Sequence, residues 1–471
     1  RDVAPSRGLG DVYKRQNPYS DSFARIADRV GMLVVDELTD KWSDNDYWGG
    51  RQPFTHIWHK LITEWIKRDR NRPSIILWSL GNELQIREGW AGFEGTNDWG
   101  ITTYNIFNQL VKRWDNTRLT TVAMFPARAG AITRHDKEFN DYLVPPELAC
   151  ATEVASFNYQ SDKYDAYLKY RPDLILFQSE AETSNLLQPY YNMDRKRTVG
   201  MAYWGSAEYW GESNKWPKKG WNYSFFDHTM RPYPQAYLIK SAFMPEIPEV
   251  HIGVVDAAGA ESVNWNDVIV GRMALNECWN HTPGSRRSLF TFTNAHSVEL
   301  LVNGQSMGIQ ENDTTRANLR NMIYWKDVPY GNGGSVVAIA RDKSGKEVAR
   351  HRIETAGKAV ALRIEAETPT DWKADGMDLQ YINVTVIDKK GRPVWDYNEP
   401  LTLQMEGAAR LVALDNGDHY TDELFHGITS KRMYQGRMQI ILRSDQEAGN
   451  VTVKISSAGL KGTLRLKTIK E

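Results

Sequence analysis

The stretch SIILWSLGNE, residues 74–83, places an apolar run directly before Asn82 and Glu83. A continuous apolar run of this length is typical of a strand that is buried on both faces, as in a parallel sheet. Residues 56–70, HIWHKLITEWIKRDR, precede it and carry apolar residues at helical spacing. A helix followed by a buried strand is the repeating unit of an α/β fold. The stretch therefore predicts a rigid strand with a carboxylate at its carboxyl end.

The same alternation of strand and helix patterns extends over the first half of the chain. Six apolar runs read as strands, and they lie in residues 31–37, 74–82, 118–124, 151–159, 174–180 and 198–205. Helix-patterned segments separate most of them, which predicts a parallel sheet in an α/β barrel or a doubly wound fold. No glycine-rich phosphate loop follows any of these strands, and this disfavours the nucleotide-binding version.

After about residue 248 the pattern changes to short strands with Gly, Asn and Asp turns, such as SLFTFTN at 288–294 and NVTVKISS at 450–457. Such spacing predicts all-β sandwich domains. We expect one sandwich over 248–357 and a second over 358–471, after a barrel domain over 17–247. Residues 1–16, RDVAPSRGLGDVYKRQ, fit no periodic pattern and are expected to be a non-native leader outside the fold.

Composition excludes several classes of function. Lys and Arg number 58 against 59 Asp and Glu, and no basic tract is present, so nucleic acid is not expected as a partner. No apolar run approaches the roughly 20 residues of a membrane span. The two cysteines, Cys150 and Cys278, are far apart, and the ten histidines show no metal-binding spacing. We therefore expect neither a metal nor another cofactor.

Polar residues at the predicted strand ends indicate a site. In parallel barrels these ends converge on one open face, where catalytic groups lie. Glu83 and Glu180 end strands that are three apart in order, so a closed barrel would bring them together across its mouth. Two facing carboxylates are what glycosidic cleavage requires. Taken singly, either glutamate has a structural explanation, such as a favourable position near a helix N-terminus.

Four segments then carry a resemblance to a known family. RDRNRPSIILWSLGNE (68–83) resembles the acid/base signature of glycoside hydrolase family 2, and NPYSDSFARIADRVGMLVVDE (17–37) resembles the family segment upstream. LILFQSEAETS (174–184) is similar to its nucleophile segment, and AYWGSAEYWGE (202–212) to its eighth-strand segment. The resemblance implies an incomplete (β/α)8 TIM barrel followed by two immunoglobulin-like β-sandwich domains.

The resemblance also implies roles for individual residues. Glu83 would be the general acid/base, held protonated by a pocket of low polarity, and Glu180 the nucleophile of a double displacement. Asn82 would bind the hydroxyl next to the anomeric carbon, Tyr159 would hold the nucleophile, and Trp204 would wall the pocket. The weaker candidates for the outer sugar hydroxyls are Asp36, Asp40 and Trp42.

Measured against the family, the sequence matches only barrel strands three to eight, with Gln16 in place of the usual His. We therefore expect the chain alone to be unstable and inactive, because unpaired strand edges favour aggregation. By resemblance, the location is periplasmic or secreted.

The substrate implied is an oligosaccharide or glycoside with a terminal β-linked sugar, and most readily a β-galactoside. The glucuronidase branch has an Asn-x-Lys pair where this sequence reads GWNYSFFD (220–227), without the Lys. Lys218 and Lys219 lie close by, so a β-glucuronidase or another β-glycosidase stays an alternative. A non-catalytic carbohydrate-binding protein is a further alternative, although it has no need of two opposed carboxylates.

Overall fold

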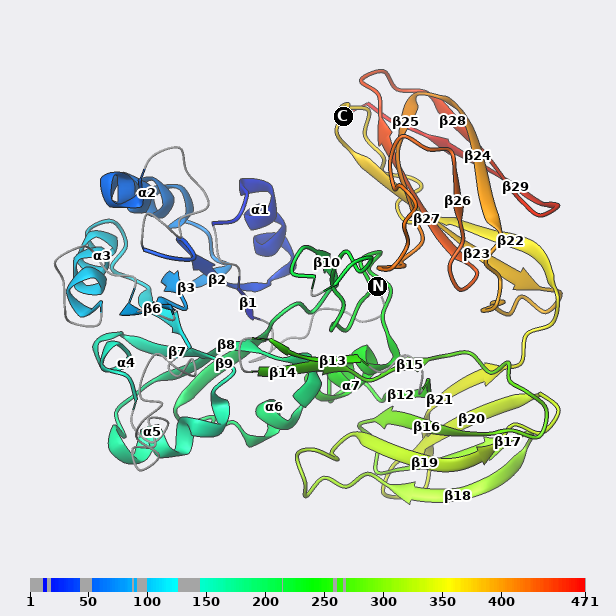
Figure 1. Cartoon of the computed structure of the whole chain (residues 1–471), viewed down its shortest axis with the longest axis horizontal. Helices are drawn as coiled ribbons and strands as arrows, with labels where there is room; N and C mark the ends of the chain where they lie inside the picture. The colour runs from blue at the N-terminus through cyan, green and yellow to red at the C-terminus, as the bar shows by residue number, and fades with distance from the viewer. Residues whose placement is uncertain are drawn as a thin grey trace.

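The computed structural model of the chain describes residues 12–14, 18–42, 53–86, 89–90, 100–125, 145–213, 215–256, 261–265 and 268–470. Figure 1 shows three parts: a curled parallel sheet with helices at the N-terminal end, and two β-rich domains beside it. The described residues therefore contain the predicted α/β part, followed by all-β parts.

The parallel sheet has the strand order β1-β2-β3-β6-β7-β8-β9, so the strands follow one another as they do in a barrel. Its members are β1 (Val12–Lys14), β2 (Leu33–Glu37), β3 (Ile75–Asn82), β6 (Leu119–Met124), β7 (Val154–Asn158), β8 (Leu176–Ala181) and β9 (Thr198–Tyr203). The two end strands β1 and β9 also contact each other, so the sheet curls round toward closure.

Strand β1 differs from the sequence-based expectation, because it lies within residues 1–16. Its three residues pair in parallel register with β2, from Val12 opposite Leu33 to Lys14 opposite Val35. The other residues of the expected leader, 1–11 and 15–16, lie outside the described residues. Three residues are too short for a periodic pattern, so pairing with β2 rather than local sequence marks this strand.

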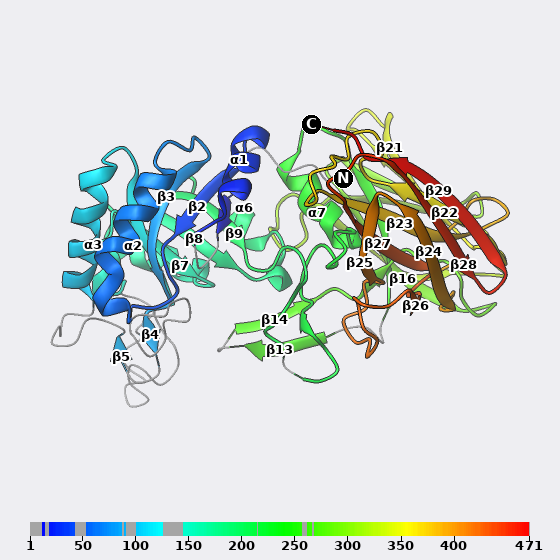
Figure 2. The ribbon, with the colours of Figure 1, turned by 90° about the horizontal axis from the view of Figure 1, so that it is seen from above.

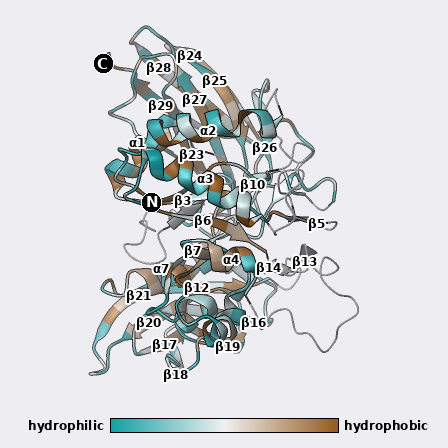
Figure 3. Cartoon of the chain, turned by 90° about the vertical axis from the view of Figure 1, so that its left-hand side faces the viewer, coloured by the Kyte–Doolittle hydropathy of each residue, from teal (hydrophilic) through white to brown (hydrophobic). Residues whose placement is uncertain are grey.

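Helices cover the outside of the sheet (Figures 1 and 2). They are α1 (Asp21–Val30), α2 (Phe54–Asp69), α3 (Ile101–Trp114), α4 (Glu147–Ala151), α5 (Tyr164–Tyr170) and α6 (Gln188–Asn192). Helix α1 begins where Ser20 caps the N–H of Phe23 and ends at Gly31, whose φ of 71° is left-handed. Figure 3 shows hydrophilic and hydrophobic residues mixed along α1, α2 and α3, as expected of helices with one buried face. No described helix is long and apolar enough to cross a membrane.

Apolar side chains fill both sides of the sheet. On the outer side Trp65 of α2 packs edge-to-face on Trp78 of β3, with ring centroids 4.9 Å apart. A separate inner cluster takes one residue from each of five strands: Val35, Leu77, Val154, Phe177 and Ala202. Such a layer closes one end of a barrel. Because these apolar side chains fill one end of the barrel interior, polar groups can lie at the other end, where the strands have their carboxyl ends.

Two sandwich domains follow, each built from two four-stranded antiparallel sheets. The first pairs β15 (Leu275–Asn276), β12 (Val250–Val255), β16 (Arg286–Thr293) and β19 (Met322–Pro329) in one sheet, and β18 (Gln305–Glu311), β17 (Ser297–Val302), β20 (Ser335–Arg341) and β21 (Glu347–Glu354) in the other. The second has β22 (Ala359–Ala366), β23 (Leu379–Asp388), β27 (Arg437–Ser444) and β25 (Ala409–Asp415) facing β26 (Ser430–Arg432), β24 (Pro400–Gly407), β28 (Asn450–Ser457) and β29 (Leu460–Lys467). The predicted fold class, a TIM-barrel domain followed by β domains, is confirmed.

Both sandwiches contact the barrel part through the segment after β9. Helix α7 (Pro234–Phe243) packs on β12 and β16 of the first sandwich, and Leu238 and Phe292 belong to one apolar cluster there. Ahead of α7, Lys219 donates its backbone N–H to His419 of the second sandwich at 3.0 Å. The ring of Trp210 lies edge-on to Phe425 of that sandwich, at 4.6 Å between centroids. This segment of the chain therefore connects all three parts.

Candidate active site

Glu83 follows the last residue of β3 in a strained conformation. Its φ is 43°, in the left-handed region that non-glycine residues rarely adopt. The backbone N–H of Glu83 donates to the carbonyl of Ala123 in the neighbouring strand β6, at 2.7 Å. The sheet therefore holds the turn that aims the carboxylate, and outliers of this kind cluster at active sites.

Glu180 lies in β8, three places along the strand order from β3. Only 3% of its surface is exposed. The hydroxyl of Tyr159 donates a hydrogen bond to its Oε2 at 2.6 Å, the contact that the sequence-based prediction expects. Tyr159 also has a left-handed φ of 60°, and its N–H donates to the carbonyl of Glu180 at 2.7 Å.

Asn158, the residue before Tyr159, connects strand β8 to Glu83. Its side-chain amide donates to Glu83 Oε1 at 3.1 Å and to Asn82 Oδ1 at 3.0 Å. Ser179, the residue before Glu180, donates its hydroxyl to Asn158 Oδ1 at 2.7 Å. Two consecutive residues at the end of β7 thus contact the two glutamates, Asn158 on one side and Tyr159 on the other. The structure brings Glu83 and Glu180 to one site.

Asn82 and Asp40 extend this network. Asn82 is 1% exposed and donates its amide to Asp40 Oδ1 at 3.0 Å. The ammonium of Lys41 donates to the same Asp40 oxygen at 2.8 Å and to the carbonyl of Asn82 at 3.0 Å. The loop after β2 is therefore fixed to the end of β3 by charge-assisted hydrogen bonds, which place Asp40 beside Asn82.

A third side of the site comes from the segment after β9. Trp204 is half-buried, and its ring lies at 90° to that of Tyr209. Glu212 accepts a hydrogen bond from the hydroxyl of Tyr209. Burial is the main cause that raises the pKa of Glu212, and the negative charges of Glu180 and Asp40 raise it further. An additional carboxylate therefore belongs to the electrostatic surroundings of Glu180.

Burial also sets the protonation of neighbouring groups. The pKa of Tyr159 lies well above its ordinary value, first because the ring is buried and then because Glu180 is negatively charged. The phenol thus stays protonated and keeps donating to Glu180. Burial likewise raises the pKa of Glu182, two residues further on, whose Oε1 accepts from Asn185.

The structure does not bring Asp36 or Trp42 to this network. Side chains alternate along a strand, so Glu37 rather than Asp36 accepts from Ser79 of β3, while Asp36 turns outward and accepts from Trp65 of α2 at 2.7 Å. Burial raises the pKa of Asp36 to about 7. Trp42 is wholly buried and donates its indole N–H to the carbonyl of Leu80 at 2.8 Å. Both residues are positioned as supports behind the site rather than as sugar contacts.

Sequence reasoning overlooked several residues of the site. Asn158 ends a predicted strand and could have been included on that ground, whereas Ser179 and Lys41 carry no sequence signal of their own. Tyr209 and Glu212 lie within the quoted segment 202–212, but only the fold shows that they reach Glu180. Among the described residues, two groups could hold a metal ion by composition: Glu208, His228 and His419, and His251, Glu277 and His351. Neither group contains Glu83 or Glu180.

Two matches to glycoside hydrolase family 2 domains cover separate parts of the chain. Residues 14–200 match the TIM barrel domain of glycosyl hydrolases family 2. Residues 362–464 match the glycoside hydrolase family 2 C-terminal domain 5. Between them, residues 284–349 match a domain of unknown function, DUF4982.

Whole-chain comparisons agree with these matches. The β-galactosidase BoGH2A of Bacteroides ovatus is 24% identical over 510 residues, which covers 98% of this chain and 57% of that protein. A putative β-glucuronidase of Formosa agariphila is also 24% identical, over 98% of this chain and 45% of its own length. The chain thus spans about half the length of the curated relatives it matches.

A solved structure extends the likeness to the whole fold. The crystal structure of a glycosyl hydrolase family 2 member from Bacteroides cellulosilyticus is 25% identical, with a TM-score of 0.83 over 98% of this chain and 58% of that one. The barrel match, the C-terminal match and this shared fold agree along the sequence. The chain belongs to glycoside hydrolase family 2.

Proposed function

We propose that the chain carries the active site of a retaining, exo-acting β-glycosidase. In this reaction Glu180 attacks the anomeric carbon while Glu83 protonates the departing glycosidic oxygen, so that a covalent glycosyl ester forms. Glu83 then takes a proton from water, which attacks the same carbon and releases Glu180. Membership of the family and the two carboxylates at the ends of β3 and β8 support this proposal.

The contacts of Asn158 and Tyr159 carry the proposal furthest. Tyr159 donates to Glu180 Oε2, which orients the carboxylate and stabilises its charge. Asn158 donates to Glu83 Oε1, which orients this carboxyl group. The two carboxyl groups thus have different hydrogen-bond partners, which supports the different roles, nucleophile and acid/base, that retention requires.

We further propose a neutral sugar, and in particular a β-galactoside, as the substrate. Glu212 adds negative charge near Glu180, and this repels the carboxylate of a glucuronide, whereas the charge of Asp40 is paired with Lys41. The ammonium of Lys218 donates to the hydroxyl of Tyr223 at 3.1 Å, and that of Lys219 donates to the carbonyl of Thr421 in the second sandwich. Both nearby lysines thus have partners other than a sugar.

A panel of aryl β-glycosides tests the substrate, with the full-length parent protein as the enzyme, because the chain alone is expected to be inactive. We expect kcat/KM for the β-galactoside to exceed that for the β-glucuronide, with the β-glucoside and β-mannoside as neutral comparisons. A preference for the glucuronide would reject the neutral-sugar proposal and favour the alternative. Binding without turnover of any member would instead reject the enzyme proposal and indicate a carbohydrate-binding protein.

The first prediction concerns the nucleophile. Glu180→Gln nearly abolishes turnover because the amide oxygen cannot form the glycosyl ester at a useful rate. A mechanism-based 2-fluoro sugar labels the wild-type protein at Glu180, and peptide mass spectrometry locates the label. Glu182→Gln is the matched control, since it changes the next carboxylate along the chain. A label on Glu182, or an equal loss of turnover in both variants, would show that Glu180 is not the nucleophile.

The second prediction concerns the acid. Glu83→Ala slows substrates with poor leaving groups by about 10²–10⁴-fold, whereas aryl glycosides with acidic phenols lose far less in the first step. A series of aryl glycosides whose phenols differ in pKa measures this effect. The value of kcat/KM should fall more steeply with leaving-group pKa in Glu83→Ala than in the wild type. An equal loss across the series would show that Glu83 does not protonate the leaving group.

The third prediction uses the strained backbone of Glu83. A glycine adopts the φ of 43° without an energetic penalty, whereas an alanine adopts it at a cost in free energy. Glu83→Gly should therefore have a free energy of unfolding about 1 kcal/mol above that of Glu83→Ala, although both lack the acid. Urea unfolding followed by tryptophan fluorescence compares the two variants. If Glu83→Ala is the more stable, the strain inferred at this position is absent.

A further inference from the structure

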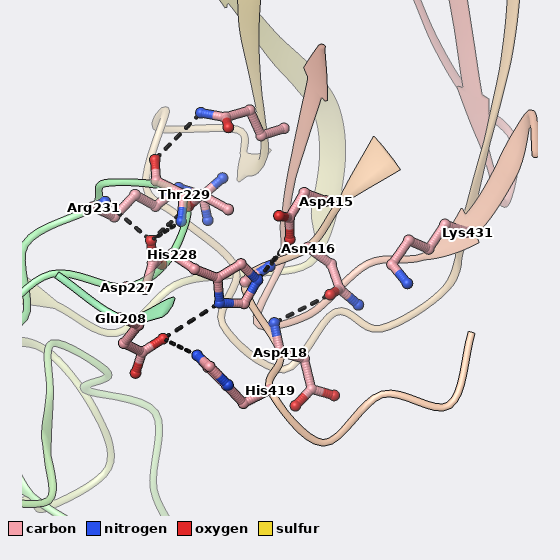
Figure 4. Close-up of polar contacts among 12 residues, drawn as sticks. Glu208, Asp227, His228, Thr229, Arg231, Asp415, Asn416, Asp418, His419 and Lys431 are labelled. Atoms are coloured by element: carbon pink, nitrogen blue, oxygen red, sulfur yellow. Dashed lines mark hydrogen bonds and ion pairs between the residues drawn. The ribbon is translucent and has the colours of Figure 1, made fainter. Parts of the chain in front are cut away.

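A second cluster of chemically competent side chains lies away from the glutamate pair, where the barrel part meets the second sandwich. Figure 4 shows Glu208 and His228, from the segment after β9, turned toward His419, from the loop after β25. The side chains of Glu208, His228 and His419 are 1%, 5% and 3% exposed. The glycosidase chemistry proposed above uses none of the three.

The separations of their ligand atoms fit one small cation. Glu208 Oε2 lies 3.4 Å from His228 Nδ1 and 3.1 Å from His419 Nε2. All three atoms lie within 4.8 Å of one another. With zinc–ligand distances of about 2.0–2.2 Å, neighbouring ligand atoms of a tetrahedral site are about 3.3–3.6 Å apart. The two imidazole planes are at 89°, so their lone pairs can converge on one point.

The outer contacts resemble those that orient metal ligands. His228 Nε2 lies 2.9 Å from Asp415 Oδ1, which fixes the ring so that Nδ1 points toward Glu208. The hydroxyl of Tyr233 donates to Glu208 Oε1 at 2.8 Å, which leaves Oε2 to face the two histidines. Metal-bound histidines almost always donate their second ring nitrogen to a carboxylate or carbonyl in this manner.

His419 supplies an independent observation. The ring is buried, and neither of its nitrogens has an aligned hydrogen bond within the described part of the chain. The 3.1 Å approach of Nε2 to Glu208 is therefore close without being a well-directed hydrogen bond. A buried ring nitrogen without such a partner is costly. An ion between Nε2 and Oε2 would satisfy both atoms.

The other histidine cluster in the described residues lacks this geometry. The rings of His251 and His351 are stacked, with centroids 3.9 Å apart and planes at 25°, so their in-plane lone pairs run side by side rather than converging. His351 Nδ1 already accepts the backbone N–H of Ile252 at 3.0 Å. Composition alone would select both clusters, and geometry selects only the first.

We propose that Glu208, His228 and His419 form a zinc site that holds the second sandwich against the barrel. The two imidazoles and the carboxylate give three protein ligands, and a water molecule in the fourth position completes the tetrahedron, as in zinc sites that keep one position open. Glu208 immediately precedes Tyr209, which packs beside Trp204 and donates to Glu212. A zinc ion bound to Glu208 would therefore also hold Tyr209 in position beside the candidate active site.

Zinc titration of the full chain tests this site. After treatment with a chelator, the wild-type chain should bind one equivalent of Zn²⁺ in competition with a chromophoric chelator and melt at a higher temperature. His419→Ala and His228→Gln should lose this equivalent. His426→Ala is the matched control, because His426 is exposed in the same loop, and it should bind zinc as the wild type does.

Two further measurements separate a lost ligand from a lost fold. Glu208→Gln keeps the size of the side chain, and its amide oxygen can still accept from Tyr233, but it removes the charge and one acceptor, so it should lose the bound zinc. Asp415→Asn, which changes only the outer contact, should weaken zinc binding by about 10–100-fold. Cobalt in place of zinc should give the intense visible bands of a tetrahedral site. Absence of a bound equivalent in the wild type, or an equivalent that persists in both histidine variants, would overturn the proposal and leave an interdomain ion-pair cluster.

Discussion

The pair of hydrogen bonds from the end of β7 is the constraint on which the candidate site depends. Asn158 donates to Glu83 and Tyr159 donates to Glu180, so two neighbouring residues set the positions of two carboxylates from different strands. Glu83 and Tyr159 both have left-handed φ values, at the point where each strand ends. The strain is offset by the sheet, whose hydrogen bonds hold both turns.

The layers of the barrel explain how a buried polar site is tolerated. Apolar residues from five strands close the interior at one end, and hydrogen-bonded polar residues follow at the other. Between the two, Thr121 and Ser156 share a hydrogen bond at 2.6 Å. Almost every polar side chain named in the site has a partner, which is what burial requires. The residues of the candidate site are therefore held by the ends of the barrel strands and not by loops alone.

The strands of the barrel and the carboxylates at their ends could be predicted from local sequence patterns. The apolar run before Asn82 and Glu83 predicted β3 and its carboxylate, and the run before Glu180 predicted β8, because the strands of a buried parallel sheet read as continuous apolar runs. The sequence does not show to which side of the sheet a residue at a strand end points. Asp36 is an example: because successive side chains of β2 point to opposite faces, a shift of one residue decides whether a side chain faces the site or the outer helices. Strand β1 was missed because three residues carry no period, and Glu208, His228 and His419 were missed because up to 211 positions separate them.

The central claim is that Glu83 and Glu180 act as a retaining pair, and the configuration of the first product tests it most directly. Retention requires carboxyl groups about 5–5.5 Å apart, whereas inversion needs about 6.5–9.5 Å to admit a water molecule between sugar and base. Proton NMR during hydrolysis of an aryl β-galactoside follows the anomeric signals before mutarotation mixes them. The account predicts that the β-anomer appears first. Initial release of the α-anomer would contradict it.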